Sequence, residues 1–189
     1  AVKLHTVGKP LPGVELRIVA PDGIDTPSGE PGEIWVRSRS AMAGYVGGGD
    51  APTTTGDWLR TGDLGRLDDD GFLFYHGRSD DMFKVSGATV FPTEVEQALR
   101  DIDGVDNAFV TNLAGGRGDH VGAAVVCDTA ATTAEKLRAS ARTVLSSFKV
   151  PTVWLLVDSD DMIPRGPTGK VDVRRLRELL AATDSAQPG

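Results

Sequence analysis

Short runs in which apolar and polar residues alternate dominate the first part of the chain. VELRIV (Val14 to Val19) and GEIWVRS (Gly32 to Ser38) each predict a strand. WLRTGDLGRL leads through an Asp-Gly turn at 68–71 into the apolar run FLFY, which is typical of a β-hairpin. A loop rich in Gly and Thr is expected at 44–56. Since no long helical pattern interrupts these runs, residues 1–76 are predicted to form a small β-rich, barrel-like subdomain.

From residue 82 onward the pattern changes to strands that alternate with helices. MFKVSGATV predicts a hairpin with its turn near Ser86 and Gly87. VDNAFVTNL and HVGAAVVCD predict two strands joined by a turn-rich linker at 114–119, and VPTVWLLVD predicts a strand too apolar to face water on both sides. Residues 82–189 are therefore expected to form a mixed α+β domain with a three-stranded sheet and helices.

A polar segment, Gly77 to Asp81, joins these two parts and is too flexible in composition to pack inside a domain, so we expect a hinge at 77–81. Pro92 then starts a helix that reaches about Asp101. Its first turn carries two carboxylates that favour the positive end of the helix dipole, Glu94 and Glu96. Its apolar face is expected to consist of Val95, Ala98, Leu99 and Ile102.

Two further helices are predicted from apolar residues at helical spacing. The first is capped by Thr132 or Thr133. Its apolar positions are Leu137, Ala141, Val144, Leu145 and Phe148. The last helix begins at Asp172, a good N-cap residue, and the segment ATDSAQPG after it is expected to be a frayed tail. The residues that this helix is expected to bury are Val173, Leu176, Leu179 and Leu180.

The composition is that of a globular protein with an acidic surface. The chain has 189 residues, of which 40% are hydrophobic, and it can bury a sizeable core. The net charge is −7. Residues 1–76 carry 7 basic and 11 acidic side chains, and residues 77–189 carry 13 basic and 16 acidic side chains. Neither half has a basic face, so nucleic acid is not an expected partner. No run approaches the roughly 20 apolar residues of a membrane-spanning helix, and no signal-peptide pattern is present.

Cysteine and histidine usage argues against a disulfide and against a metal site. The single Cys127 lies in an apolar run, and we expect a buried core thiol rather than a nucleophile. A lone thiol fits a reducing compartment, so a cytoplasmic location is predicted. The three histidines are scattered, and the acidic turns at 68–70 and 158–161 are expected to be solvated. No residue is therefore predicted to bind a metal ion.

Three short motifs occur in a characteristic order. TGDL (Thr61 to Leu64) comes first, and GPTGK (Gly166 to Lys170) comes near the end. The residues of a linker motif lie between them: Arg78, Asp80, Lys84, Gly87, Pro92, Glu94 and Glu96. Together with the helix-favouring VDVRRLRELL, these motifs resemble those of the adenylate-forming enzymes, which are acyl-CoA synthetases, adenylation domains of peptide synthetases and luciferases. The resemblance covers nearly all of the chain but only about the last third of such an enzyme.

The resemblance implies a nucleotide site to which three residues contribute. Lys170 would neutralise the acyl carboxylate and the α-phosphate of ATP as they come together, and Val171 after it excludes a phosphate-binding P-loop. Asp63 would accept hydrogen bonds from the two ribose hydroxyls, and Arg78 would contact the ribose or the phosphates. The alternatives are a solvated Lys170, an Asp63 in a turn bonded to its own backbone, and an inter-domain salt bridge at Arg78.

The resemblance also implies a rotation of the C-terminal domain between two reactions. Asp80 matches the hinge position. Lys84 would act in the thioester-forming conformation, and Gly87 would line the passage for the pantetheine arm of coenzyme A. Ser86 belongs to a version of this loop that resembles acyl-CoA ligases more than peptide-synthetase domains. Like Gly87, it is expected to contribute to the coenzyme A site. The alternatives are a solvent-facing Lys84 and a plain hairpin turn at Gly87.

The activity implied for the parent enzyme is ATP-dependent acid–thiol ligation. A carboxylic acid, fatty in our preferred interpretation, would be activated to acyl-AMP and transferred to coenzyme A. Transfer to a carrier protein, an aryl acid substrate and a non-catalytic docking module are the alternatives. The chain lacks a phosphate loop of the TSGTTGxPK type and an aromatic-Gly-x-Thr-Glu segment. We therefore expect a C-terminal fragment that is inactive alone, with a large N-terminal domain as its partner and Mg²⁺ held mainly by that domain. The oligomeric state is left open.

Overall fold

The computed structural model describes residues 5–39, 54–116 and 118–186. The chain divides after Asp81 into two compact units. The predicted fold class is confirmed, because a β-rich unit precedes a mixed α+β unit with a three-stranded sheet. Most of the Gly- and Thr-rich loop predicted at 44–56 lies outside the described residues. No described helix is both long enough and apolar enough to cross a membrane.

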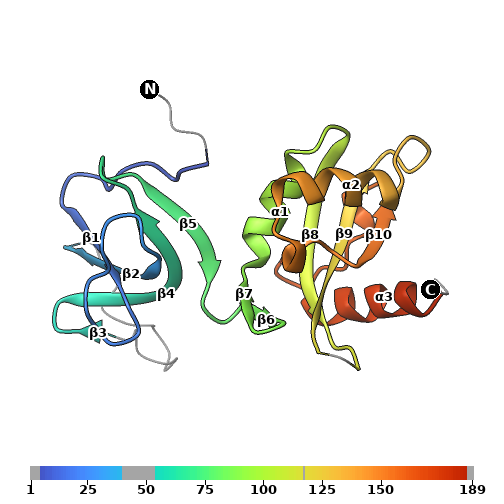
Figure 1. The fold of residues 1–189 in the computed structure, drawn as a ribbon. Helices are drawn as coiled ribbons and strands as arrows, with labels where there is room; N and C mark the ends of the chain where they lie inside the picture. The colour runs from blue at the N-terminus through green and yellow to red at the C-terminus, as the bar shows by residue number, and fades with distance from the viewer. Residues whose placement is uncertain (1–4, 40–53, 117, 187–189) are drawn as a thin grey trace. The chain divides into compact units, whose positions relative to one another are not determined.

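The first unit is a curled antiparallel sheet of five strands (Figure 1). Its strands are β1 (Val14–Val19), β2 (Gly32–Ser38), β3 (Thr54–Thr55), β4 (Trp58–Leu67) and β5 (Leu73–Arg78). The strand order is β1-β2-β4-β3, and β5 pairs with the second half of β4. Both predicted strands and the predicted hairpin are confirmed. The buried apolar side chains of this sheet are Ile18, Val19, Ile34 and Trp35.

The close packing of β4 depends on the glycine at position 65. A Cβ atom there would lie 2.6 Å from the carbonyl oxygen of Phe74 and 2.9 Å from Cδ1 of Ile34. Since that carbonyl belongs to the paired strand β5, it cannot move without loosening the pairing. We expect Gly65→Ala to lower the free energy of unfolding by about 1–3 kcal/mol in urea denaturation. Gly116→Ala is the control, because an added Cβ there would lie within 4 Å of no described atom outside its chain neighbours. Equal stabilities of the two variants would contradict this account.

Strand β5 continues further than predicted. It includes Gly77 and Arg78, because Arg78 pairs in register with Asp63 of β4. The hinge predicted at 77–81 therefore shortens to the turn at 79–81, just before the boundary between the units. The hinge function of this turn stays a prediction.

The second unit begins with the predicted hairpin, in which β6 (Phe83–Val85) pairs with β7 (Ala88–Val90). Helix α1 (Pro92–Arg100) follows. The strands of the three-stranded sheet, in the order β10-β9-β8, are β8 (Val105–Leu113), β9 (His120–Cys127) and β10 (Val153–Val157). β9 runs antiparallel to β8 and parallel to β10. The remaining elements are α2 (Ala134–Val144), the 3₁₀ turns η1 (Ser147–Lys149) and η2 (Asp160–Met162), and α3 (Val173–Ala186).

The central strand β9 is buried on both faces of this sheet. On one face it packs with α1 and α2 through alternate residues, Val121, Ala123, Val125 and Cys127. On the other face Ala124 and Val126 pack with Leu176 and Leu180 of α3. Coverage on both sides explains why the strand is apolar throughout rather than alternating. Cys127 is a buried core residue as predicted, and burial raises the pKa of its thiol.

The predicted helices are confirmed, but several of their details are wrong. α2, capped by the Thr133 hydroxyl, ends at Val144, which is 63% exposed. Phe148 lies in η1 instead. In α3 the sheet covers Leu176 and Leu180, whereas Val173 and Leu179 are 42% and 43% exposed. The segment predicted as a frayed tail is helical through Ala186, since its alanines favour a helix.

Candidate active site

Three of the predicted site residues form one ionic cluster in the first unit. Asp63 and Arg78 lie opposite each other on β4 and β5, and Nη1 of Arg78 is 3.5 Å from Oδ1 of Asp63. Nε of Arg78 also donates a hydrogen bond of 2.9 Å to Oδ1 of Asp80. This bond raises the pKa of Arg78 and lowers the pKa of Asp80. The side chains are 33% to 68% exposed, so the cluster is accessible to a ligand.

The motif TGDL lies within β4 rather than in a turn, so the alternative of a turn aspartate at position 63 is wrong. The Thr61 hydroxyl donates to the carbonyl oxygen of Ile34 at 2.7 Å and accepts from the backbone N–H of Asp63 at 3.0 Å. Gly62 adopts a φ of +72°, and its carbonyl oxygen accepts from the N–H of Ser79 at 2.8 Å. The backbone on both sides of the Asp63–Arg78 pair is thus held by hydrogen bonds.

The predicted coenzyme A residues lie together on the β6–β7 hairpin of the second unit. Ser86 and Gly87 have φ values of +50° and +84°, which a tight hairpin turn requires. The Lys84 ammonium donates a hydrogen bond to the hydroxyl of its cross-strand neighbour Thr89. The turn by itself explains Gly87, and the passage role of Gly87 stays a prediction. Ser86 lines a cavity of about 500 Å³, whose rim includes Gly116, Gly118, His120 and Phe148.

Lys170 lies in a different loop of the second unit. The backbone N–H of Gly166 donates to the carbonyl oxygen of Lys170 at 2.8 Å, and that of Gly169 donates to Gly166 at 3.0 Å. The loop is therefore a closed, hydrogen-bonded turn. The Lys170 side chain is exposed, and its ammonium has no ion pair with any residue that the structure describes.

Potential metal ligands are scattered in the part of the chain that the structure describes. Among them, no group of three or more His, Cys, Asp or Glu side chains could hold a metal ion. Nε2 of His120 lies 4.0 Å from Oδ2 of Asp184.

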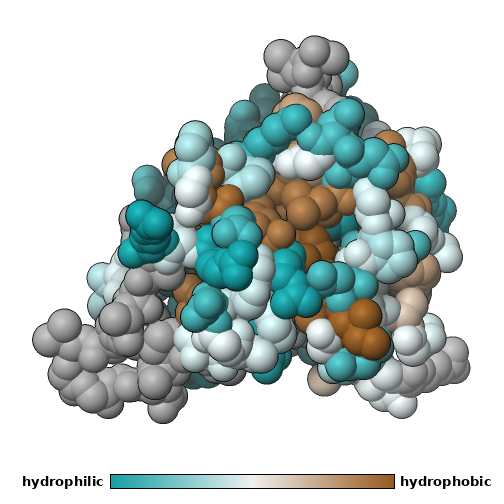
Figure 2. Space-filling model, turned by 90° about the vertical axis from the view of Figure 1, so that its left-hand side faces the viewer, coloured by the Kyte–Doolittle hydropathy of each residue, from teal (hydrophilic) through white to brown (hydrophobic). Residues whose placement is uncertain are grey.

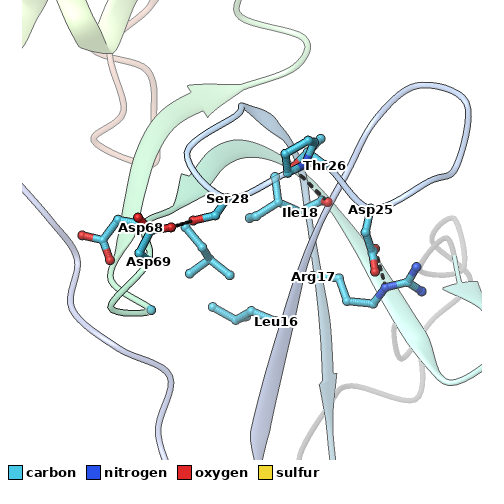
Figure 3. A pocket seen from close by; sticks show the side chains of 11 residues that line it. Leu16, Arg17, Ile18, Asp25, Thr26, Ser28, Asp68 and Asp69 are labelled. Atoms are coloured by element: carbon cyan, nitrogen blue, oxygen red, sulfur yellow. Dashed lines mark hydrogen bonds and ion pairs between the residues drawn. The ribbon is translucent and has the colours of Figure 1, made fainter.

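The first unit also has a hollow with an apolar floor, which contains none of the predicted site residues. Figure 2 shows apolar surface gathered on one face of this unit and ringed by hydrophilic side chains. The hollow has a volume of about 440 Å³, and its apolar lining includes Leu16, Ile18 and Leu67. Polar rim residues bond to one another, as in the 2.7 Å pair of Arg17 with Asp25 (Figure 3).

Comparison with known proteins decides the family. The family described as AMP-binding enzyme matches residues 1–46. A long-chain-fatty-acid–CoA ligase of Yersinia pestis is 35% identical over 96% of this chain and 33% of its own length. A fatty acid–[acyl-carrier-protein] ligase, ScoC of Streptomyces coeruleorubidus, is 34% identical over 93% of this chain and 34% of its own length. The o-succinylbenzoate CoA synthetase of Bacillus subtilis, solved with its acyl-adenylate intermediate, superposes with a TM-score of 0.81 at 30% identity, over 93% of this chain and 36% of that one. The chain belongs to the adenylate-forming enzymes.

The chain spans about a third of the length of the curated relatives that it matches.

One residue near the ionic cluster has a structural role that the motifs do not reveal. Oε2 of Glu33 accepts hydrogen bonds from Arg60 at 2.8 Å and from the Trp35 indole at 3.0 Å, and Oε1 accepts from the N–H of Gly62 at 3.2 Å. Glu33 thereby ties TGDL to β2. An alternating strand pattern contains no signal for such a role.

The contacts of Glu33 predict a pH dependence of stability. Burial raises its pKa, but the hydrogen bonds from Arg60 and Trp35 outweigh burial and leave the pKa below its ordinary value of 4.5. A carboxylate whose pKa is lowered by folding stabilises the fold above its unfolded pKa, and this stabilisation is lost as the pH falls through the folded pKa. We therefore expect stability to decline on acidification below pH 4.5, and to decline less in Glu33→Gln. Urea denaturation at a series of pH values checks this, and identical pH profiles would contradict it.

Proposed function

We propose that this chain is the C-terminal part of an acyl-CoA synthetase that activates a fatty acid with ATP and transfers the acyl group to coenzyme A. The observation that carries the proposal is the cluster in which Arg78 joins Asp63, the proposed ribose ligand, to Asp80, the proposed hinge residue. Two relatives whose names specify fatty acids support the substrate class. The relative from Yersinia pestis supports coenzyme A as the acceptor.

In the first step a carboxylate oxygen of the acid attacks the α-phosphorus of ATP. The bond from that phosphorus to the oxygen bridging to the β-phosphorus breaks, and pyrophosphate leaves. Lys170 brings a compact positive charge to the two negatively charged reactants as they approach, which stabilises the transition state. Asp63 orients the nucleotide by accepting hydrogen bonds from both ribose hydroxyls, and Arg78 contacts the ribose or the phosphates.

In the second step the thiol sulfur of coenzyme A attacks the acyl carbon of the adenylate. The bond from that carbon to the phosphate oxygen breaks, AMP leaves, and the thiol proton is released. The domain rotates at Asp80 between the steps, so that Lys84, Ser86 and Gly87 serve the thioester step. The glycine-rich rim beside Ser86 leaves room for a narrow thiol-bearing arm. The chain alone is proposed to be inactive, because we assign the binding pocket for the acid, the Mg²⁺ site and most of the ATP contacts to the large N-terminal domain.

Product analysis with the full-length protein tests this proposal. Incubation with Mg-ATP, coenzyme A and a panel of fatty and aromatic acids is expected to yield fatty acyl-CoA and AMP in equal amounts, detected by mass spectrometry. Thioester on a phosphopantetheine carrier protein but not on coenzyme A would instead support the alternative acceptor, which the relative from Streptomyces coeruleorubidus favours. Aryl-CoA without fatty acyl-CoA would contradict the proposed substrate class.

A further inference from the structure

Arg165, which directly precedes the GPTGK turn, contacts three separate parts of the second unit. Its Nη2 forms an ion pair with the carboxylate of Asp160 in η2. Its Nη1 donates a hydrogen bond of 3.0 Å to the carbonyl oxygen of Gly169, the residue just before Lys170. Its guanidinium lies 5.8 Å from the ring centroid of Phe109 on β8. Arg165 therefore links the loop that carries Lys170 to the body of the unit.

Asp160 is itself anchored to the sheet. Its Oδ1 accepts a hydrogen bond of 3.0 Å from the side-chain amide of Asn107 on β8. The prediction that the acidic turn at 158–161 is merely solvated is therefore wrong for Asp160, because both of its carboxylate oxygens are bound. A continuous path of polar contacts runs from β8 through Asp160 and Arg165 to the backbone at Gly169.

The backbone on both sides of Lys170 is fixed by this arrangement. Arg165 and Val171 form an antiparallel bridge, and the carbonyl oxygen of Lys170 accepts from Gly166 at 2.8 Å. The N–H of Asp172 donates to the carbonyl oxygen of Pro164, also at 2.8 Å. The glycines at 166 and 169 would otherwise allow this segment to sample many backbone conformations. The side chain of Lys170 itself has no bond to a described residue.

We propose that Arg165 is a positioning residue for Lys170 in the adenylation step. This inference rests on the proposed function, in which the Lys170 ammonium stabilises the transition state. Holding a reacting group within a fraction of an ångström of its working position lowers the barrier, and a displacement of about 1 Å can cost 10²-fold in rate. An arginine suits the position because its fork donates to Asp160 and to the Gly169 carbonyl at once, whereas a lysine is a point charge.

The full-length protein tests this with Arg165→Met, Arg165→Lys, Lys170→Ala and the double variant Arg165→Met/Lys170→Ala. The Arg165 side chain is 38% exposed and belongs to neither hydrophobic core cluster, so its replacement is expected to leave the core intact. The matched control is Arg174→Met, which removes an arginine that is 75% exposed and pairs with Glu178 on α3. Two half-reactions are measured separately: acyl-AMP formation from acid and ATP, and thioester formation from supplied acyl-AMP and coenzyme A.

We expect Arg165→Met to lower kcat for acyl-AMP formation by about 10- to 100-fold, with little change in KM for ATP or in the rate from supplied acyl-AMP. The kcat of Arg165→Lys for acyl-AMP formation is expected to lie between those of Arg165→Met and wild type. The kcat of Arg174→Met should equal that of wild type. Since Arg165 acts through Lys170, the double variant should be no slower than Lys170→Ala alone. These results together support the positioning role.

Three results would overturn it. If Arg165→Met formed acyl-AMP at the wild-type rate while Lys170→Ala was impaired, the positioning role would be wrong. The proposed function would be unaffected. Arg165→Met could instead slow both half-reactions equally, or the rate losses of the two single variants could multiply in the double variant. Either result would mean that Arg165 supports the general stability of the domain instead. Wild-type adenylation by Lys170→Ala would remove the proposed role of Lys170 and the positioning role with it.

Discussion

Replacement of Lys170 by alanine is expected to slow acyl-AMP formation by the full-length protein by about 10²- to 10³-fold, the usual cost of removing one preorganised donor from a developing charge. The loss should appear in kcat, because the ammonium is proposed to act on the transition state more than on the bound substrates. The exposed side chain has no ion pair with a described residue, so its removal should leave stability unchanged. Single-turnover measurement of pyrophosphate release checks the rate.

Lys136→Ala is the control for Lys170→Ala. Lys136 is an exposed lysine of the same unit, on α2, and its ammonium bonds only locally to the carbonyl oxygen of Ala131 at 2.9 Å. The Lys136→Ala variant should form acyl-AMP at the wild-type rate. If Lys170→Ala retained near wild-type adenylation, the assignment of the lysine would be wrong. If both lysine variants were equally slow, the effect would be one of net charge rather than of position.

Asp63→Asn is expected to weaken nucleotide binding by about 10- to 100-fold, since hydrogen bonds to charged groups contribute about 1.5–3 kcal/mol each. The test that isolates the ribose contact compares ATP with 2′,3′-dideoxy-ATP by calorimetry on the full-length protein. Wild type should bind ATP more tightly than the dideoxy nucleotide. Asp63→Asn should discriminate much less between them, because it lacks the carboxylate that is proposed to bind the two hydroxyls.

The control for this experiment is Asp69→Asn. Asp69 lies beyond the other end of β4, where it accepts a hydrogen bond of 2.6 Å from Ser28. This variant should keep wild-type affinity and discrimination. An Asp63→Asn protein that distinguished the two nucleotides as well as wild type does would show that Asp63 does not contact the ribose.

The elements that local pattern determines could be predicted from the sequence. The β4–β5 and β6–β7 hairpins follow from turn residues between apolar runs, and α1 follows from Pro92 and its apolar spacing. What pattern alone does not determine is which apolar residues a neighbouring element covers. Leu179 belongs to the apolar stripe of α3, but the sheet reaches only as far as Leu176 and Leu180, so Leu179 stays 43% exposed.

The grouping of Asp63 with Arg78 could not be predicted from the hairpin alone. Counting back along the hairpin from the pair Leu67 and Leu73 places Asp63 opposite Gly77. A register shift between Leu64 and Gly65 places it opposite Arg78 instead. A shift of one residue reverses which side chains share a face, and nothing in the local sequence announces it.

The network around Lys170 was missed for a different reason. Asn107 lies on β8, at the opposite edge of the sheet from β10, yet it donates a hydrogen bond to Asp160 of η2. Asp160 in turn pairs with Arg165 in the following loop. Motif comparison identified Lys170, but it carried no information on the residues that hold the loop. Polar contacts between distant segments require the fold before they can be recognised.

The most direct test of the central claim is exchange of radiolabelled pyrophosphate into ATP by the full-length protein, without coenzyme A. If this chain belongs to a fatty acid-activating ligase, exchange should require a fatty acid, and Lys170→Ala should abolish nearly all of it. Exchange that proceeds equally without any acid, or that no fatty acid supports while an aromatic acid does, would contradict the account.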